Sequence, residues 1–320
     1  MAKADLLKAL IHSHFEEDRE RFNLLALQIA AQEARLGHTV VAGDIKTLID
    51  KNRSRIRKDV VLLPGFDDLI SKVEIRHKLS ELVSSPKLKN QLGRVLLEYR
   101  QRDTLQKHGL FFRRKILLTG PPGTGKTMSA SVIATELHLP LYIVTMDRVV
   151  QKYMGETNAK LRQVFDIIRE QPGVYFFDEF DAIGGDRSKD NDVGEMRRVV
   201  NAFLQFLEND ASDSFILAAT NNLRLLDQAL FRRFDDVLMY HLPSEEEARR
   251  LLTNTVGTFL GNQMINGLPQ GIERLSQAEL VQIGCDTIKD AILAGEKKVD
   301  LNILANHLQE KIAFQTHLKP

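Results

Sequence analysis

The clearest chemistry in this chain belongs to the octapeptide GPPGTGKT at residues 120–127. It fits the spacing G-x-x-x-x-G-K-[ST], and an apolar run at residues 115–119 leads directly into it. A strand, a glycine-rich loop and a helix in that order form a phosphate-binding loop (P-loop), whose backbone N–H groups surround the phosphates. An ordinary glycine turn is the alternative, and it is weak because a chain of this length shows the bare pattern by chance roughly one time in a hundred. The sequence therefore predicts a nucleoside triphosphate site.

Each position of this loop has an expected task. Lys126 would reach the β- and γ-phosphates, and the Thr127 hydroxyl would hold Mg²⁺. The loop would bind the nucleotide through Gly120, Pro121, Pro122, Gly123, Thr124, Gly125, Lys126, Thr127 and Met128.

Two acids follow a second apolar strand. Residues 173–177, Gly-Val-Tyr-Phe-Phe, end in Asp178 and Glu179. A buried strand that ends in carboxylates can deliver them to a metal-bound triphosphate. Asp178 would hold Mg²⁺ directly or through water, and Glu179 would act as general base on the attacking water. Surface acids after a buried strand are the alternative, which the P-loop about 50 residues upstream disfavours.

Three further residues complete the candidate machinery. Asn221 follows the apolar run 215–219, and its neutral side chain could orient a water without cancelling the charge of Lys126. Arg232 and Arg233 stand in an apolar context, where cations are costly unless they meet anions. Either could be an arginine finger that completes the site of a neighbouring subunit. The alternative is an intrachain pair with the acids at 235 and 236, and the sequence leaves open which arginine acts in trans.

Composition narrows the function classes. The chain has 320 residues, a net charge of +1 and one cysteine, so no global field favours nucleic acid or an acidic membrane. A single cysteine forms no internal disulfide and fits a reducing compartment. No apolar run approaches the ~20 residues of a membrane helix, and the N-terminus has no signal-peptide core. We expect a cytoplasmic protein without a membrane partner.

The elements that must position these residues alternate between strand and helix. The alternation predicts an α/β fold, a doubly wound parallel sheet with helices on both faces. Ligands bind beyond the carboxyl ends of such strands, where the P-loop begins. The predicted strands are 116–119, 141–145, 174–177, 215–219 and 237–240, and the predicted helices between them are 128–137, 159–169 and 195–207.

Helices are predicted on both sides of this α/β part. Apolar spacing predicts one helix over 4–36, a second that begins at Asp44, and a third over 73–107. After Pro243 the pattern is helical only, and capping boxes begin two of the helices. We therefore expect an N-terminal helical hairpin at 1–60, a helical linker at 61–109, a large α/β domain at 110–243 and an all-helical lid at 244–320.

In their order, these motifs resemble the signatures of AAA ATPases: GPPGTGKT, then Phe-Asp-Glu-Phe-Asp at 177–181, Ala-Thr-Asn at 219–221 and Arg-Arg-Phe-Asp at 232–235. The arginine pair and the later Leu-Pro at 242–243 are similar to the branch that holds katanin, spastin and the ESCRT-disassembling ATPase. Overall the chain most resembles small stand-alone bacterial AAA proteins often encoded beside subtilisin-like serine proteases. Over residues 105–310, the resemblance implies ATP as the nucleotide and a homo-oligomeric ring, usually a hexamer, with ATP at each subunit interface.

The resemblance extends to two other segments. Residues 151–156 are similar to the family's first pore loop, in which an aromatic residue grips an extended polypeptide. Tyr153 would be that residue, flanked by Lys152 and Met154; a tyrosine packed on its own domain is the alternative. In the lid, a Gly-Ala pair commonly opens the helix that touches the nucleotide. Here the pair is Gln-Ala, so only Ala278 carries over as a nucleotide contact. Residues 66–70 lie where the family supplies backbone contacts to the base.

Three functions remain open. The hydrolytic set and Tyr153 favour an ATP-driven ring that remodels, unfolds or disassembles a protein client. A nucleotide-controlled switch that regulates a partner such as a protease is the alternative, with residues 1–60 recognising that partner. A nucleic-acid motor is suggested only by basic runs at 51–58 and 113–115, and the neutral net charge disfavours it.

Overall fold

The computed structural model describes twelve stretches of the chain, which divides into two compact units, residues 1–63 and 64–320. The second unit carries the described candidate site residues. The described residues are 8, 10, 12–13, 19–38, 41–47, 69–74, 77–149, 154–180, 192–221, 231–261, 263–265 and 267–318.

The first unit contains helix α2 (Arg19–Arg35) and a helical stretch at 41–47. Gly37 lies between them with a φ of 87°, a left-handed conformation that ends helices and favours glycine. Residues 41–43 of the second helical stretch precede Asp44, which therefore lies in its interior. Asp44 is therefore not the N-cap that the sequence predicted.

The second unit is built around a six-stranded sheet in the order β1-β3-β4-β5-β2-β6. Strands β2 to β6 are parallel, and β1 pairs antiparallel with β3 at one edge. The parallel α/β fold predicted from the sequence is confirmed, with an antiparallel edge strand that was not expected. The strands are β1 (Ile70–Val73), β2 (Lys115–Thr119), β3 (Leu141–Val144), β4 (Val174–Phe177), β5 (Phe215–Thr220) and β6 (Asp236–Met239).

The helix predicted over 73–107 is wrong in its first part. Val73 ends β1, and residues 77–85 contain no helix. Helix α4 (Pro86–Arg100) begins where the Ser85 hydroxyl accepts a hydrogen bond from the Leu88 N–H at 3.3 Å. Proline fits a first helical turn because that turn needs no N–H from it, and it breaks a helix interior. A short helix, α5 (Arg102–Lys107), follows.

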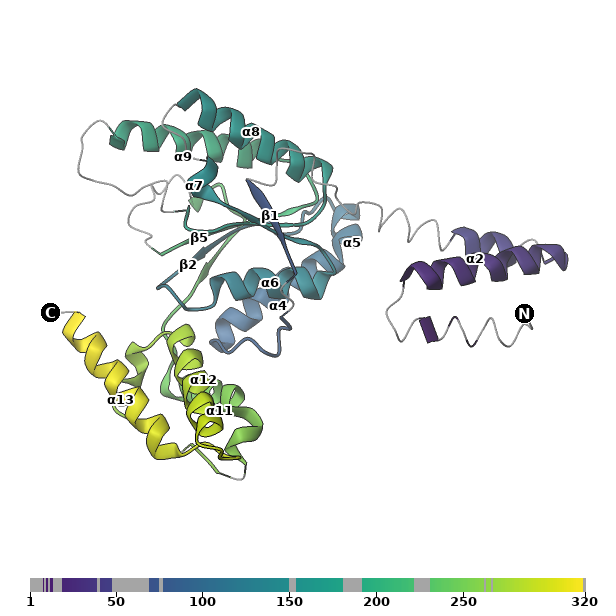
Figure 1. The fold of residues 1–320 in the computed structure, drawn as a ribbon. Coiled ribbons are helices and arrows are strands. Elements are labelled where there is room, and N and C mark those ends of the chain that lie inside the picture. The colour runs from purple at the N-terminus through teal and green to yellow at the C-terminus, as the bar shows by residue number, and fades with distance from the viewer. Residues whose placement is uncertain are drawn as a thin grey trace. The chain divides into compact units, whose positions relative to one another are not determined.

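Helices cover both faces of the sheet (Figure 1). Helices α4 and α6 (Lys126–Leu137) lie on one face, and α8 (Met154–Glu170) and α9 (Asp192–Asn209) on the other. Alternation along β4 serves both layers. Phe176 is part of the apolar core with α4 and α6, whereas Phe177 meets an aromatic ring from each of α8 and α9. One turn of helix, α7 (Met146–Val149), follows β3.

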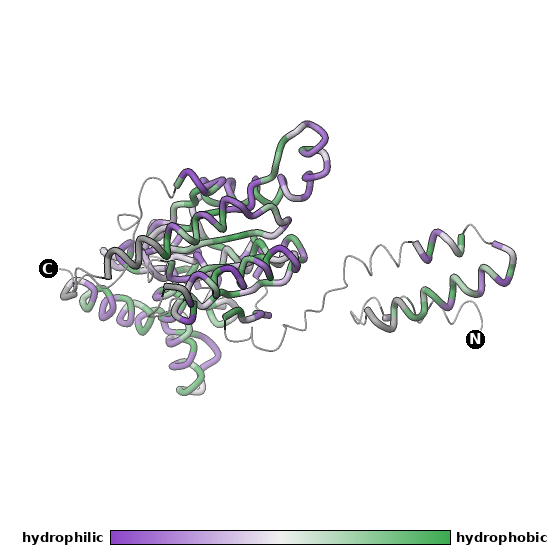
Figure 2. Tube along the Cα trace, turned by 90° about the horizontal axis from the view of Figure 1, so that it is seen from above, coloured by the Kyte–Doolittle hydropathy of each residue, from purple (hydrophilic) through white to green (hydrophobic). Residues whose placement is uncertain are grey.

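A helical subdomain, the lid, follows Pro243 and has an apolar core of its own. Both predicted capping boxes are present, Ser244 with Glu247 and Ser276 with Glu279. In Figure 2 the helices alternate between purple and green along their length, as amphipathic helices do. None of the helices in the described stretches has the length and apolar content of a membrane span. The lid elements are α11 (Glu245–Val256), η3 (Gly257–Leu260), η4 (Ile272–Arg274), α12 (Gln277–Leu293) and α13 (Leu301–Leu318).

Candidate functional site

The P-loop turns tightly between the end of β2 and the start of α6. Gly120 has a φ of 147°, and a Cβ at this position would collide with the carbonyl of Tyr240. Gly125 has a φ of 94° and directly precedes Lys126, the first residue of α6. The loop thus places its backbone N–H groups and the positive end of the twelve-residue α6 at the carboxyl edge of the sheet.

Lys126 is held at the base of this loop and is only 7% exposed. Its Nζ donates to the carbonyl oxygens of Gly120 and Pro121, both at 2.9 Å. It also donates to Asn221 Oδ1 at 2.8 Å, and Asn221 follows β5, the strand beside β2. The structure therefore brings together the lysine and the asparagine that the sequence singled out, with neutral oxygens around the ammonium.

The acids after β4 face the other end of the loop. Thr127 Oγ1 and Asp178 Oδ2 lie 3.5 Å apart, which is longer than an ordinary O–H···O hydrogen bond. Asp178 Oδ1 accepts from the Glu179 N–H at 2.9 Å. Glu179 has a φ of 49°, a left-handed conformation that costs a non-glycine residue about 1–2 kcal/mol. Strain of this kind is typical of functional sites.

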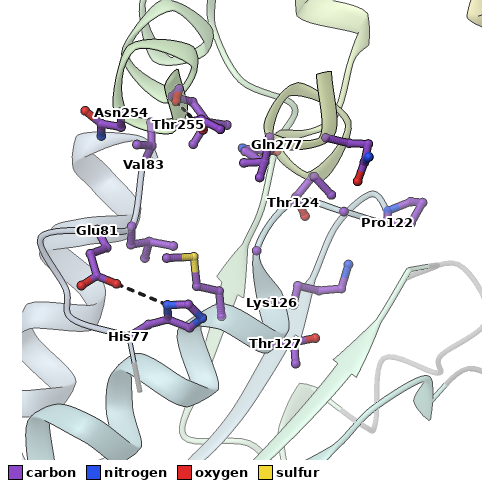
Figure 3. A pocket seen from close by; sticks show the side chains of 18 of the residues that line it. His77, Glu81, Val83, Pro122, Thr124, Lys126, Thr127, Asn254, Thr255 and Gln277 are labelled. Atoms are coloured by element: carbon purple, nitrogen blue, oxygen red, sulfur yellow. Dashed lines mark hydrogen bonds and ion pairs between the residues drawn. The ribbon is translucent and has the colours of Figure 1, made fainter. Parts of the chain in front are cut away.

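A cavity of about 940 Å³ joins these residues (Figure 3). Figure 3 shows Pro122, Thr124 and Lys126 on one side, His77 on the opposite side, and Gln277 of the lid above the loop. Among the sequence-predicted site residues, those that line the cavity are Pro122, Gly123, Thr124, Gly125, Lys126, Thr127, Met128, Asp178, Glu179, Asn221 and Ala278. Gly120 and Pro121 contribute the carbonyl oxygens that hold Lys126.

The wall opposite the P-loop was missed at the sequence level. It consists of residues 77 and 80–83, with His77 Nδ1 and Glu81 Oε2 3.3 Å apart. Base contacts were expected from residues 66–70, of which 66–68 lie outside the described residues. Leu69 and Ile70 do not line the cavity, because β1 pairs with β3 and three strands separate it from β2. The Ser-Pro helix start at 85–86 was the signal that could have left 77–85 available as a wall.

The lid reaches the P-loop directly. Ala278 N–H donates to the carbonyl oxygen of Gly123 at 2.9 Å. Gln277 Nε2 donates to the carbonyl oxygen of His241, in the segment that joins the sheet to the lid, at 3.2 Å. Ala278, the expected lid contact, therefore lies beside the P-loop, and its N–H is hydrogen-bonded to the backbone of that loop.

The arginine pair lies at the amino edge of the sheet, where the parallel strands begin, whereas the P-loop lies at the carboxyl edge, where they end. Arg232 and Arg233 precede β6, which runs parallel to β2 and pairs its first residue with Ile116 near the start of β2. The P-loop follows the far end of β2, whose five residues span about 16 Å. The pair and the P-loop of the same chain therefore stand at opposite edges.

The two acids expected to neutralise this pair have other partners. Asp235 Oδ2 accepts from the backbone N–H groups of Arg114 and Lys115, both at 2.9 Å. Asp236 Oδ2 pairs with Arg113 Nη1 at 2.7 Å. The proposed pairing of the arginines with these acids is wrong, because both acids are bonded to residues 113–115 at the start of β2.

The structure separates the two arginines. Arg233 forms an ion pair with Glu208 of α9. Arg232 is exposed and forms no ion pair with any residue in the described stretches. Arg233 thus has a structural partner, and Arg232 presents its charge outward.

The pore loop expected at residues 151–156 stays a prediction. Lys152 and Tyr153 lie outside the described residues, and Met154 begins α8 without a described side chain.

Comparison with known proteins agrees with this geometry. A family model described as "ATPase family associated with various cellular activities (AAA)" matches residues 116–242. An uncharacterized AAA family ATPase of Sinorhizobium fredii is 33% identical over 339 aligned positions, which cover 100% of this chain and 99% of that protein. The chain is an AAA family ATPase. ATP is therefore its nucleotide, and hydrolysis of ATP its reaction.

Two longer relatives match part of this AAA ATPase. The peroxisomal ATPase pex6 of Schizosaccharomyces pombe is 34% identical over 226 residues, 64% of this chain and 24% of that protein. A putative 26S proteasome regulatory subunit homolog of Methanothermobacter thermautotrophicus is 35% identical over 148 residues, 45% of this chain and 40% of that protein. This AAA ATPase therefore spans less than half of either relative.

Proposed function

We propose that this AAA ATPase works as a homo-oligomeric ring, a hexamer of the katanin and spastin branch, in which Arg232 of one subunit completes the ATP site of the next. The observation that carries the proposal is the position of Arg232, exposed and without an ion-pair partner among the described residues. It lies at the sheet edge opposite the P-loop of its own chain. A cation in that place serves a triphosphate only when a second subunit brings its P-loop alongside.

Mg²⁺ fits the residues at the P-loop. The Thr127 hydroxyl and an Asp178 carboxylate oxygen lie 3.5 Å apart, and Mg²⁺ prefers oxygen ligands. Mg²⁺ uses one or two protein carboxylates and takes its other ligands from phosphates and water. No group of three His, Cys, Asp or Glu side chains suited to a metal occurs within the described ranges, so a site shared with the substrate fits better than a closed protein site. Thr127 and Asp178 would hold the ion, which would neutralise part of the triphosphate charge.

The side chains of the site would divide the reaction among them. The loop amides and Lys126 would bind the β- and γ-phosphates, and Asn221 would orient the attacking water. Glu179 would take a proton from this water while the oxygen of the water bonds to the γ-phosphorus. The bond from the γ-phosphorus to the bridging oxygen then breaks, and ADP leaves. Arg232 of the neighbouring subunit would stabilise the negative charge on the transferred phosphoryl group.

Remodelling of a protein client is the proposed purpose of this cycle. The resemblance of residues 151–156 to a pore loop supports it, with Tyr153 gripping the client. A peroxisomal ATPase and a proteasome regulatory subunit homolog among the relatives support it by their names. The hairpin at 1–60 would select the client, and the lid at 244–320 would follow the nucleotide state. Replacement of Tyr153 by alanine should stop client processing while ATPase activity survives.

A nucleotide-controlled switch is the second candidate. The contact between Ala278 and Gly123 favours it, because this contact ties the lid to the loop that binds phosphates. A switch that activates a partner, such as a serine protease, needs ATP binding alone. A slowly hydrolysed ATP analogue should then support full activation of the partner, whereas a remodeller would stall.

A nucleic-acid motor loses its support at residues 113–115. Arg113 pairs with Asp236, and Arg114 pairs with Asp210, whose side chain is fully buried. These cations therefore hold the sheet edge together and do not form a free basic surface.

The ring is tested by the mass of the Glu179→Gln variant in solution, by light scattering with and without ATP and Mg²⁺. Loss of the general base should keep ATP bound, so the mass should rise to about six subunits. A monomer under saturating ATP would leave Arg232 without a site to complete and would contradict the proposal.

A further inference from the structure

The contact between the lid and the P-loop is close and depends on a glycine. A Cβ added to Gly123 would lie 2.8 Å from Ser276 Oγ and 3.1 Å from the Ala278 Cβ. Gly123 also has a φ of 73°, which residues with a side chain rarely adopt. The first turn of α12 therefore rests on the backbone of this loop position, and Ala278 N–H donates to its carbonyl oxygen at 2.9 Å.

This hydrogen bond fixes the direction of the next amide. A trans peptide unit is planar, so the carbonyl of Gly123 and the N–H of Thr124 point in opposite directions. The lid holds the carbonyl on its own side, and the Thr124 N–H consequently points away from the lid contact. That amide donates to no residue that the structure describes. Thr124 is only 3% exposed, and its Oγ1 donates to the Pro121 carbonyl at 2.7 Å.

The donor on the lid is itself held in place. Ser276 caps α12, and Glu279 Oε2 accepts from the Ser276 N–H at 2.9 Å. Glu279 Oε1 accepts from Gln315 Nε2 of α13 at 2.7 Å, and Lys311 lies 3.7 Å away. Burial alone would raise the pKa of Glu279, but these hydrogen bonds and Lys311 lower it, so the carboxylate stays ionised. Helix α13 thus supports the turn that carries the Ala278 N–H.

We propose that Ala278 is a positioning residue for phosphate binding: its N–H orients the Gly123–Thr124 peptide so that the Thr124 N–H is fixed toward the β-phosphate of the nucleotide. The inference rests on the proposed role of the P-loop and adds a backbone contact from the lid to it. The lid would thereby contribute to affinity for the phosphates without touching them.

Replacement of Ala278 by proline tests this inference, because it removes the N–H of Ala278 and leaves the sequence of the P-loop unchanged. Ala278 is the second residue of α12, and a first helical turn accepts proline. Glu246 is the matched control: it is the second residue of α11, which begins with the same Ser–Glu capping box, and it does not line the cavity. Ala278→Ser keeps the N–H and should restore binding.

Equilibrium binding of ADP and of adenosine is measured by calorimetry for each variant. We expect Ala278→Pro to bind ADP about tenfold more weakly, which equals about 1.4 kcal/mol. Adenosine has no phosphate, so its affinity should change less than twofold, an effect of below about 0.4 kcal/mol. Glu246→Pro and Ala278→Ser should bind ADP like the unchanged protein.

Two results would overturn the inference: unchanged ADP affinity in Ala278→Pro, or equal losses for ADP and adenosine, which would indicate a displaced lid. If Ala278→Pro does not fold, Glu279→Ala replaces it, since this variant keeps every α12 amide and loosens only their support. It should weaken ADP binding about threefold, with Glu247→Ala of α11 as control, and an unchanged affinity would overturn the inference. Lys126→Ala is measured in parallel, because wild-type ADP affinity there would refute the P-loop assignment itself.

Discussion

Charged side chains are arranged differently at the two ends of the parallel strands. At the edge where β2 begins, arginines and acids neutralise one another within the chain, as in the Arg113–Asp236 and Arg114–Asp210 pairs. At the edge where β2 ends, Asp178 and Glu179 form no ion pair within the described part of the chain. Charges paired inside the chain stabilise its fold, whereas carboxylates left without a cation beside a cavity are suited to a ligand. Arg232 is the exception at the first edge, and for that reason we assign it to a second subunit.

The largest expected effect separates the two neighbouring arginines. Arg232→Ala should lower kcat about 10³-fold, because an arginine finger contributes about 10³–10⁵ to the rate. Arg233→Ala is the matched control and should lower kcat less than about threefold, since Arg233 is paired with Glu208 of its own chain. Steady-state ATPase assays of both variants check this prediction. Equal losses in the two variants would show that the intrachain pair does not distinguish them.

A second large effect is expected from the acids at the other edge. Glu179→Gln removes the proposed general base and should lower kcat about 10²–10⁴-fold while the affinity for ATP stays the same. Single-turnover hydrolysis and nucleotide binding separate the two quantities. Turnover at the wild-type rate would refute the role of Glu179.

Two lysines, one at the start of β2 and one after the P-loop, extend the comparison to binding. Lys126→Ala should weaken ATP binding at least about 100-fold, because hydrogen bonds to charged phosphates contribute about 1.5–3 kcal/mol each. Lys115→Ala at the start of β2 should leave ATP affinity within about twofold, since its ammonium contacts the Glu208 carbonyl at 3.4 Å and no part of the cavity. Titration with a fluorescent ATP analogue measures both. A similar loss in the two variants would place the nucleotide elsewhere.

The last prediction concerns the stability of the fold and not the chemistry. Asp210→Ala removes the partner of Arg114, whose side chain is 13% exposed, and should lower the free energy of unfolding by about 3–5 kcal/mol. Lys289→Ala, which breaks an exposed pair with Asp286, should change it by less than about 1 kcal/mol. Urea unfolding followed by circular dichroism measures both. Comparable losses would mean that burial does not set the strength of these pairs.

Sequence reasoning succeeded where a signal is local. The P-loop and the acids at 178–179 each follow a strand within a few residues, and both capping boxes span only four. Parallel strands then bring Asn221 to Lys126, because β2 and β5 are neighbours. The carboxyl-edge site could therefore be inferred from the order of the elements.

Contacts between distant segments could not be inferred in this way. Nothing near Arg233 in the sequence indicates Glu208, which reaches it from the end of α9. The cavity wall at residues 77 and 80–83 was not predicted, because apolar spacing favoured a helix from Val73. In the structure Val73 belongs to β1, which pairs with β3, and the helix begins only at Pro86. The Gly123–Ala278 contact depends on how the lid folds back onto the sheet, which a pattern of helices does not specify.

The most direct test of the shared site is the ATPase activity of an equal mixture of Arg232→Ala and Lys126→Ala. Each variant alone should be nearly inactive, one for lack of the finger and the other for lack of a bound nucleotide. In mixed rings an intact P-loop on an Arg232→Ala subunit can meet an intact Arg232 on its neighbour. Random mixing predicts recovery of about a quarter of the wild-type activity. Activity no greater than the sum of the two variants alone would contradict the claim that Arg232 acts on the neighbouring subunit.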